Sequence, residues 1–349
     1  MSGEQQPELK RKRVDESADR SSPPVEPVRS SIWYDDGNVI LQAGAMQFRV
    51  HKGILAQSSS VFSDMLSFPQ PATANVEMID ECPVVRLSDS AEEVEYVLQA
   101  LCQRKYVAFG ETVGDKLPFG VVSAFLCLGQ KYDIRSLYVE AQRRLFREFP
   151  ATLAAEDALE DWTAIDGPHY MDLVVLARKT GLLSILPRVL YGCIRNHSVD
   201  VIIDGERVDG CLKSLPIQDQ VTCLAGIQGI YQAPIDTTFQ WLWDTTKSLA
   251  VDCAQPKRCI KGLQKICSDL FTPAPAVYGY DKWVSDYSDV LCSKCTKIWM
   301  ERHEEGRKDF WEGLPGLFRL PPWTELLKER EGMYVFNTSA SRRALTNHM

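Results

Sequence analysis

The chain has 349 residues, of which 45% are hydrophobic and 25% charged, and its formal net charge is −8 at pH 7. This length suffices for two domains, and the acidic balance argues against nucleic-acid binding by the chain as a whole. The sequence has no apolar run of about 18 residues, the minimum for a membrane-spanning helix, and its polar first 30 residues do not resemble a signal peptide. We therefore expect the 11 cysteines to stay reduced.

Residues 1–30 are rich in Ser, Pro, Glu, Gln and Arg, a composition that predicts a disordered tail. Four adjacent cations lie in this tail: Lys10, Arg11, Lys12 and Arg13. They could bind the acidic groove of a nuclear-import receptor, or they could be a solvated charge run that keeps the tail soluble. We accordingly expect the protein in the nucleus or the cytoplasm.

The stretch of residues 36–66 changes its hydrophobic period half-way. The first apolar residues alternate as in a strand: Val39, Leu41, Phe48 and Val50. They flank a turn at residues 43–45, in which Gly44 can adopt the positive φ of a tight hairpin. The later apolar residues follow the spacing of one helical face: Val61, Phe62, Met65 and Leu66. With Ser58 as the predicted cap, this stretch predicts a hairpin followed by a helix in an α+β domain.

The same stretch carries residues at the spacing of a known family: Phe48, Val50, His51, Lys52, Leu55, Ala56, Ser58, Phe62, Met65 and Leu66. This pattern resembles the opening of the BTB/POZ family, and the whole chain resembles BTB proteins of basidiomycete fungi. The resemblance implies a BTB/POZ fold, in which a short β-sheet is flanked by helices, followed by a mainly α-helical C-terminal region. Within the pattern we expect His51 to be a hydrogen-bonded structural residue and not a general base.

The next elements complete the predicted domain. Residues 84–87 predict a short strand, and the spacing of Ser90 and Glu93 predicts a capping box at the start of a helix. That helix has one apolar stripe: Val94, Val97, Leu98 and Leu101. Residues 121–146 resemble the helix pair that closes BTB domains, and Pro150 ends the second helix of the pair. Three arginines of that helix are predicted to be solvated: Arg143, Arg144 and Arg147.

The segment after the predicted domain has a helical pattern. An apolar stripe predicts a helix over residues 170–178, with Gly181 as its left-handed cap. The next helix is predicted over residues 182–194, where Pro187 is tolerated only in the first turn. These two helices should form a hairpin, and residues 199–208 predict a loop with a short extended piece.

The C-terminal third is rich in cysteine and tryptophan. Its tryptophans are predicted to anchor this region on the helices by burying large apolar areas: Trp283, Trp299, Trp311 and Trp323. Four of its cysteines form two closely spaced pairs: Cys253 with Cys259, and Cys292 with Cys295. Four thiolates suit tetrahedral zinc, and an ion with four protein ligands would be structural. Cys267 and His303 are alternative ligands at one corner, and the competing interpretations are ordinary reduced thiols or a redox Cys292-x2-Cys295 pair.

These patterns divide the chain into five parts: a disordered tail of residues 1–30, a BTB/POZ domain of residues 31–150, a helical extension of residues 151–250, a Cys/Trp-containing region of residues 251–335, and a flexible tail of residues 336–349. Apart from the candidate zinc ion, no cofactor is predicted.

The sequence lacks the common catalytic motifs, including phosphate-binding loops, dinucleotide-binding glycine patterns, zinc-protease motifs and nucleophile elbows. We therefore expect a non-enzymatic protein–protein interaction protein, whose BTB domain mediates homodimerisation or recruits a partner. The candidate dimer contact is the apolar cluster of Ile32, Trp33 and Tyr34, which would be costly to expose. As the alternative, residues 151–349 would cover this cluster within one chain.

Two other functions are compatible with the resemblance. The chain could be a substrate adaptor of a cullin-type ubiquitin ligase, with the cullin bound by the helix pair of residues 125–146 and by the helices that follow. It could instead be a nuclear transcriptional co-regulator, which the cations of residues 10–13 favour. In each case the partners are proteins, and we expect no contact with membranes and no direct binding of nucleic acid.

Overall fold

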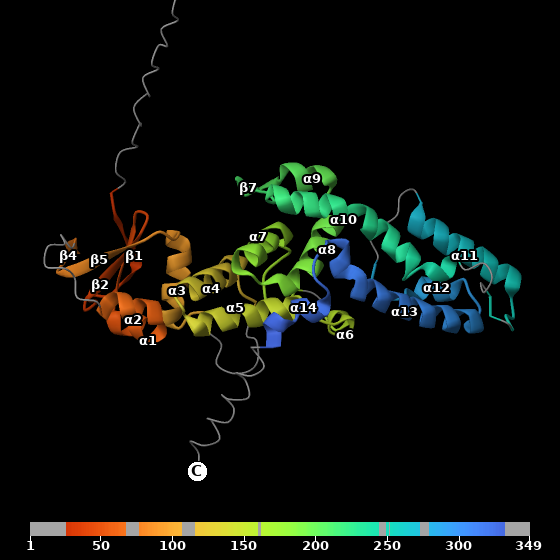
Figure 1. Ribbon diagram of the computed structural model, residues 1–349, viewed down its shortest axis with the longest axis horizontal. Helices are drawn as coiled ribbons and strands as arrows, with labels where there is room; N and C mark the ends of the chain where they lie inside the picture. The colour runs from red at the N-terminus through yellow and green to blue at the C-terminus, as the bar shows by residue number, and fades with distance from the viewer. Residues whose placement is uncertain are drawn as a thin grey trace, which may run out of the picture.

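The computed structural model describes residues 26–67, 77–106, 116–159, 162–243, 249–250, 252–272 and 279–331. Over these ranges the molecule is elongated, with a β-sheet at one end and a group of C-terminal helices at the other (Figure 1). The candidate import signal at residues 10–13 and the predicted tail of residues 336–349 lie outside the described residues. No described helix is both long enough and apolar enough to cross a membrane.

A mixed five-stranded sheet forms the N-terminal end. Its strands, in the spatial order β1-β3-β2-β5-β4, are β1 (Val28–Trp33), β2 (Val39–Ala43), β3 (Met46–Val50), β4 (Met78–Ile79) and β5 (Cys82–Leu87). β2 and β3 form the predicted hairpin, in which Ala43 pairs with Met46 and Gly44 takes a φ of 56°. The predicted apolar face is buried: Val39, Leu41, Phe48 and Val50. The first strand starts at Val28, inside the predicted tail of residues 1–30.

Five of the described helices precede residue 150: α1 (Lys52–Ser58), α2 (Ser60–Ser67), α3 (Ala91–Gln103), α4 (Phe119–Lys131) and α5 (Arg135–Glu148). The predicted cap at Ser58 is wrong by one residue. Ser58 ends α1, and the Ser59 hydroxyl accepts a hydrogen bond from the Phe62 N–H at 2.9 Å. The reason is that Ser59 has the extended backbone that a cap requires, whereas Ser58 is still helical.

The capping box at the start of α3 is confirmed in its first half. The Ser90 hydroxyl accepts a hydrogen bond from the Glu93 N–H at 3.1 Å. The Glu93 carboxylate, however, accepts from the Ser90 hydroxyl at 3.0 Å. The stripe behind the cap is the buried side of α3, as predicted, with Val94, Val97 and Leu98 in the core.

The prediction that Arg143, Arg144 and Arg147 are solvated is wrong for Arg144, which is only 1% exposed. Its guanidinium donates to Glu140 Oε1 at 2.8 Å and to the Ala164 carbonyl at 3.0 Å. The charge is buried because both partners compensate the lost hydration. Arg144 therefore ties α5 to the segment that follows the sheet domain.

The middle of the chain is mainly helical: α6 (Leu153–Asp157), α7 (Tyr170–Thr180), the 3-10 helix η1 (Leu183–Ile185), α8 (Leu186–Asn196), α9 (Val199–Asp204) and α10 (Ile217–Asp236), with β6 (Glu206–Val208) paired to β7 (Cys211–Lys213). The predicted helical hairpin is confirmed as α7 and α8. Gly181 ends α7 with a φ of 76°, and Pro187 lies in the first turn of α8.

The predicted loop at residues 199–208 is wrong in its first half, which forms α9. The Ser198 hydroxyl accepts a hydrogen bond from the Val201 N–H at 3.3 Å, and Gly205 ends the helix with a φ of 78°. The β-branched residues of this segment favour strand structure, but the cap and the burial of Ile202 outweigh that local preference.

The C-terminal elements are the 3-10 helix η2 (Gln240–Leu242), α11 (Pro256–Phe271), α12 (Ser285–Asp289), α13 (Ser293–Leu317) and α14 (Trp323–Leu326). A first core extends from Ile32 to Leu326 and is shared by the sheet and the middle helices. A smaller second core has these buried members: Phe239, Trp241, Ala250, Cys259, Leu263, Ile266, Leu270, Leu291, Cys292, Cys295 and Trp299. The predicted domain boundary at residue 250 therefore falls inside the second core.

Helix α13 connects the two cores. Trp299 near its start belongs to the second core, and Trp311 near its end belongs to the first. Between them, Arg307 donates to Asp157 of α6 at 2.5 Å. A second ion pair, between Arg195 of α8 and Asp281 at 2.9 Å, fixes the segment before α12 on the first core. Helices α11 and α12 and the start of α13 are thus held at the end of the molecule far from the sheet (Figure 1).

Candidate functional site

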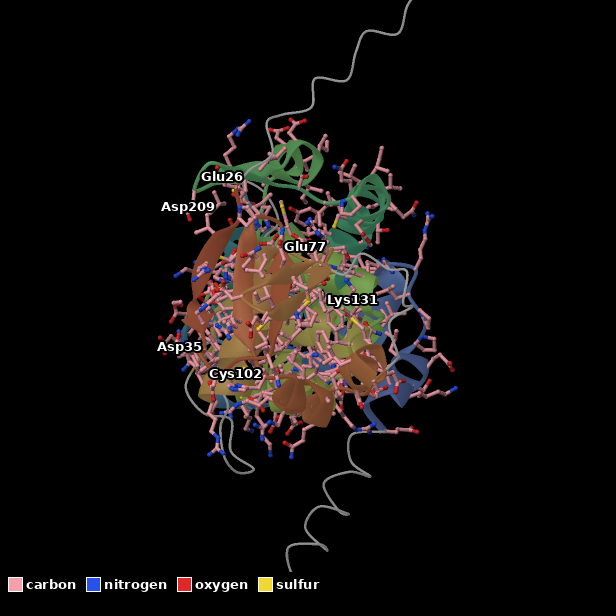
Figure 2. All side chains as sticks on the ribbon, turned by 90° about the vertical axis from the view of Figure 1, so that its left-hand side faces the viewer. Glu26, Asp35, Glu77, Cys102, Lys131 and Asp209 are labelled. Carbon is pink, nitrogen blue, oxygen red and sulfur yellow. The ribbon has the colours of Figure 1, made fainter. Side chains whose placement is uncertain are left out.

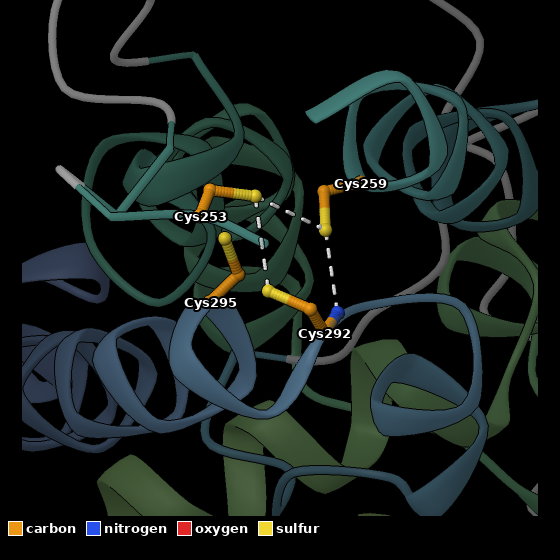
Figure 3. Close-up of side chains that lie close together, drawn as sticks. All are labelled: Cys253, Cys259, Cys292 and Cys295. Carbon is orange, nitrogen blue, oxygen red and sulfur yellow. Dashed lines mark hydrogen bonds between the residues drawn. The ribbon is translucent and has the colours of Figure 1, made fainter. Parts of the chain in front are cut away.

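Four cysteine thiols meet at the edge of the second core: Cys253, Cys259, Cys292 and Cys295. They come from three places, namely the segment before α11, the first turn of α11, and the start of α13. Their sulfur atoms all lie within 4.8 Å of one another. Figure 3 shows the four side chains pointing toward a common centre. The structure thus brings together the four residues that the sequence pattern predicted.

Local structure explains why the thiols converge. Pro256 starts α11, so Cys259 lies in the first turn of that helix and Cys253 lies on the segment that leads into it. Cys292 is the N-cap residue of α13 and Cys295 lies in its first turn, so the two-residue spacing puts both thiols at the same helix end. The starts of α11 and α13 face each other, and this places Cys253 and Cys259 against Cys292 and Cys295 (Figure 3).

Backbone N–H groups point at these sulfur atoms. The Cys292 N–H donates to Cys259 Sγ at 3.2 Å. A hydrogen bond from the Cys295 backbone lowers the pKa of the Cys292 thiol to about 6. Burial raises the pKa of the Cys259 and Cys295 thiols, although the Ala250 backbone N–H opposes this shift at Cys295. Without a cation, burial therefore opposes ionisation of the Cys259 and Cys295 thiols.

The two alternative ligands do not reach the cluster. His303 lies two turns further along α13, where its Nε2 is 3.0 Å from the Asp281 carbonyl oxygen. Cys267 lies on α11 and is half-buried, outside the group of converging thiols. This geometry does not support His303 or Cys267 as a zinc ligand in place of one of the four cysteines.

The four C-terminal tryptophans divide between the two cores. Trp299 stacks on Trp241 with ring centroids 5.8 Å apart, and Trp283 packs on Trp241 at 5.4 Å. Trp311 and Trp323 stack at 5.5 Å in the first core. The Trp323 indole N–H donates to the Trp311 carbonyl at 2.7 Å. These contacts agree with the predicted anchoring role, since the rings fill both ends of α13.

At the sheet end, the elements follow one another in the order that the sequence predicted: the β2–β3 hairpin, helices α1 and α2, the β4–β5 pair and then α3. Residues 35–101 match the BTB/POZ domain family. The fold is therefore a BTB domain with a small sheet and helices, followed by a helical C-terminal region. A BTB domain is a protein–protein interaction module and not an enzymatic one.

The match ends at Leu101, so the resemblance of the remaining chain to a fungal group stays a prediction. No curated protein matches the chain. Within the matched region, His51 has the structural role that was expected: its Nε2 lies 3.1 Å from Asp36 Oδ1, and its ring contacts Tyr34. The His51 carbonyl also accepts hydrogen bonds from the first turn of α1.

The candidate dimer cluster is only partly covered within the BTB domain. Ile32 is buried in the core, whereas Trp33 and Tyr34 are half-buried. The Arg29 guanidinium lies 4.4 Å from the centre of the Trp33 ring. Helices α11 and α12 lie at the opposite end of the molecule from this cluster (Figure 1).

The sheet of the BTB domain has one exposed apolar residue on each of its outermost strands. Figure 2 looks onto this end of the molecule, where Asp35, Glu77 and Lys131 are labelled. Val28 on β1 and Met78 on β4 are each 55% exposed, and they lie on the two outermost strands of the sheet. In the described sheet, β1 has a strand partner on one side only.

The helix pair α4–α5 is largely covered by other parts of the chain. Nearly all apolar residues of α4 are buried, and α7 packs against this helix. On α5, the Arg330 guanidinium lies 4.2 Å from the centre of the Phe146 ring and donates to the Phe149 carbonyl at 2.8 Å. The surface that the resemblance assigned to a cullin is therefore occupied in part by α7 and by the segment after α14.

Sequence reasoning did not identify one further surface. Several apolar side chains of α9, β7 and α10 are exposed: Val199, Ile203, Leu212, Ile217, Val221 and Leu224. Ile217 is 79% exposed. Ile217, Val221 and Leu224 recur at helical spacing along one side of α10, and this periodicity was a readable signal. These residues are referred to below as the α9–α10 face.

Proposed function

We propose that this chain is a non-enzymatic protein–protein interaction protein whose BTB domain forms a homodimer through the outer edge of β1. The observation that carries the proposal is the edge itself: among the described residues, β1 pairs with a strand on one side only, next to the exposed Val28. Such an edge can pair with another strand, and two copies related by a two-fold axis would place the same patch on both sides.

The half-buried rings of Trp33 and Tyr34 support the same surface. Aromatic residues are enriched at the centres of interfaces, since they bury large areas at low entropic cost. Arg29 on this surface already bonds to Asp80 at 2.8 Å, so its charge is compensated before a partner arrives. In this proposal the α9–α10 face is a second surface, available to another protein once the dimer has formed.

Light scattering on the full chain at micromolar concentration tests the proposal. We expect a dimer for the wild type and a monomer for Val28→Lys, because two lysines would meet across the two-fold axis. Ile217→Lys is the control, since Ile217 is 79% exposed on α10, outside the sheet, and it should remain a dimer. A monomeric wild type, or a dimer lost only with Ile217→Lys, would contradict the proposal.

Two alternative functions have their own tests. The cullin adaptor is supported by the α7–α8 hairpin, which directly extends the BTB domain, and co-purification of a cullin from native cells would favour it. The nuclear co-regulator depends on residues 10–13, which lie outside the described residues. Nuclear enrichment that disappears when Lys10 to Arg13 are replaced by Ser would favour that function.

A further inference from the structure

We propose that the four converging thiols bind one structural Zn²⁺ ion: Cys253, Cys259, Cys292 and Cys295. A tetrahedral ion with Zn–S bonds of about 2.3 Å separates neighbouring sulfur atoms by about 3.8 Å. Cys253 Sγ is 3.7 Å from Cys259 Sγ and 3.7 Å from Cys292 Sγ, and no pair in the cluster exceeds 4.8 Å. Two sulfur–sulfur distances thus match the edge of a tetrahedral ZnS4 unit, and the remaining pairs are close enough for four thiolates to reach one ion after a small adjustment.

A disulfide does not account for these distances. Bonded sulfur atoms are about 2.05 Å apart, and each close pair here is far longer. A redox Cys-x-x-Cys pair would leave Cys253 and Cys259 without a role, yet both sulfur atoms face the same centre (Figure 3). Packing of the second core places the two segments side by side, but it does not require four cysteine side chains to meet at one point. A soft divalent cation bound by all four thiolates gives that convergence a role.

The surroundings of the cluster suit a charged tetrathiolate. Zinc binding releases a proton from each protonated thiol and transfers no electron, so four thiolates and one Zn²⁺ leave a net charge of −2. The hydrogen bond that the Cys292 backbone N–H donates to Cys259 Sγ offsets part of that negative charge. The first turn of α13, a helix of 25 residues, contributes its positive end at Cys292 and Cys295.

The expected role is structural. Cys259, Cys292 and Cys295 are buried and Cys253 is half-buried, and four protein ligands leave no coordination position for water or substrate. The ion would join the start of α11 to the start of α13 beside the second core. Because α13 continues into the first core, the ion would also set the direction in which the second core is held. This inference goes beyond the proposed function, since the β1 edge lies at the other end of the molecule.

Elemental analysis of the purified full chain provides the first test. We expect one zinc atom per chain in the wild type and in the control Cys267→Ser, whose thiol lies on α11 outside the cluster. Cys259→Ser and Cys295→Ser should each lose most of the zinc. Replacement of zinc by Co²⁺ should produce the strong charge-transfer and d–d absorption of a tetrahedral thiolate complex, and Cys267→Ser should keep that absorption.

A second measurement does not depend on the folding of any variant. The wild-type chain would be titrated with a mercurial thiol reagent in the presence of a zinc indicator. Zinc should be released in step with modification of four thiols, and hydrogen exchange should then increase in α11 and at the start of α13 while β2 and β3 stay protected. A chain with no zinc even after refolding with Zn²⁺, zinc retained after all four thiols react, or a Cys292–Cys295 disulfide found by mass spectrometry would overturn the proposal.

Discussion

Replacing Phe48 with Ala tests whether the hairpin face is the centre of the BTB core. The Phe48 ring is 0% exposed and lies opposite Leu41 on the neighbouring strand, so truncation removes a whole aromatic ring and leaves a cavity. Such a change costs about 3–5 kcal/mol, against a total stability of about 5–15 kcal/mol for a typical domain. With an m-value of about 2–3 kcal/mol per M, the urea midpoint should fall by roughly 1–2.5 M.

Urea unfolding of the full chain, followed by far-UV circular dichroism, measures this shift. Phe48→Leu keeps most of the volume and should cost less than about 1.5 kcal/mol. Val61→Ala on the exposed side of α2 is the control, since Val61 is 38% exposed and should shift the midpoint little. If the two cores unfold in separate steps, only the first-core step should move. Equal midpoints for the wild type and Phe48→Ala, with equal m-values, would refute the argument.

Three further predictions concern close packing, a buried charge and a buried histidine. Gly129→Ala should destabilise the folded chain by about 1–3 kcal/mol in thermal unfolding, because a Cβ there would lie 2.9 Å from the α5 backbone. Gly53→Ala is the control, since a Cβ there meets nothing within 4 Å, and it should stabilise α1 by about 0.5–1 kcal/mol. Arg144→Met should cost about 2–4 kcal/mol in urea and Arg147→Met less than about 0.5, and equal costs would show that Arg144 is not buried as described. Burial lowers the pKa of His303 below 6.5, so the folded chain binds a proton at this residue less readily than the unfolded chain. The free energy of unfolding should therefore decrease as the pH falls below about 6.5, by at most about 1.4 kcal/mol per pH unit. This slope should flatten in His303→Gln, and an unchanged slope would assign the pH dependence to other groups.

Local patterns in the sequence were sufficient for the main elements of the sheet domain and for the α7–α8 hairpin. The period-two alternation before Val50 predicted the β2–β3 hairpin, and Ser90 and Gly181 predicted the start of α3 and the end of α7. These features depend on interactions within a few residues, which a sequence displays directly. The two cysteine pairs also predicted four thiolates, the right type and number of ligands for a zinc ion, although their spacing alone did not show that the pairs meet.

Only the tertiary structure decided which distant residues share a site. Cys253 and Cys259 join Cys292 and Cys295 because α11 and α13 start side by side, an arrangement set by the packing of the second core. Long-range packing also overrode local expectation elsewhere: it buried the charge of Arg144, and it kept helical the β-branched segment of α9. Burial depends on what the rest of the chain places next to a residue, and that information is spread over the whole sequence, whereas caps, turns and hydrophobic periods are each contained in a few adjacent residues.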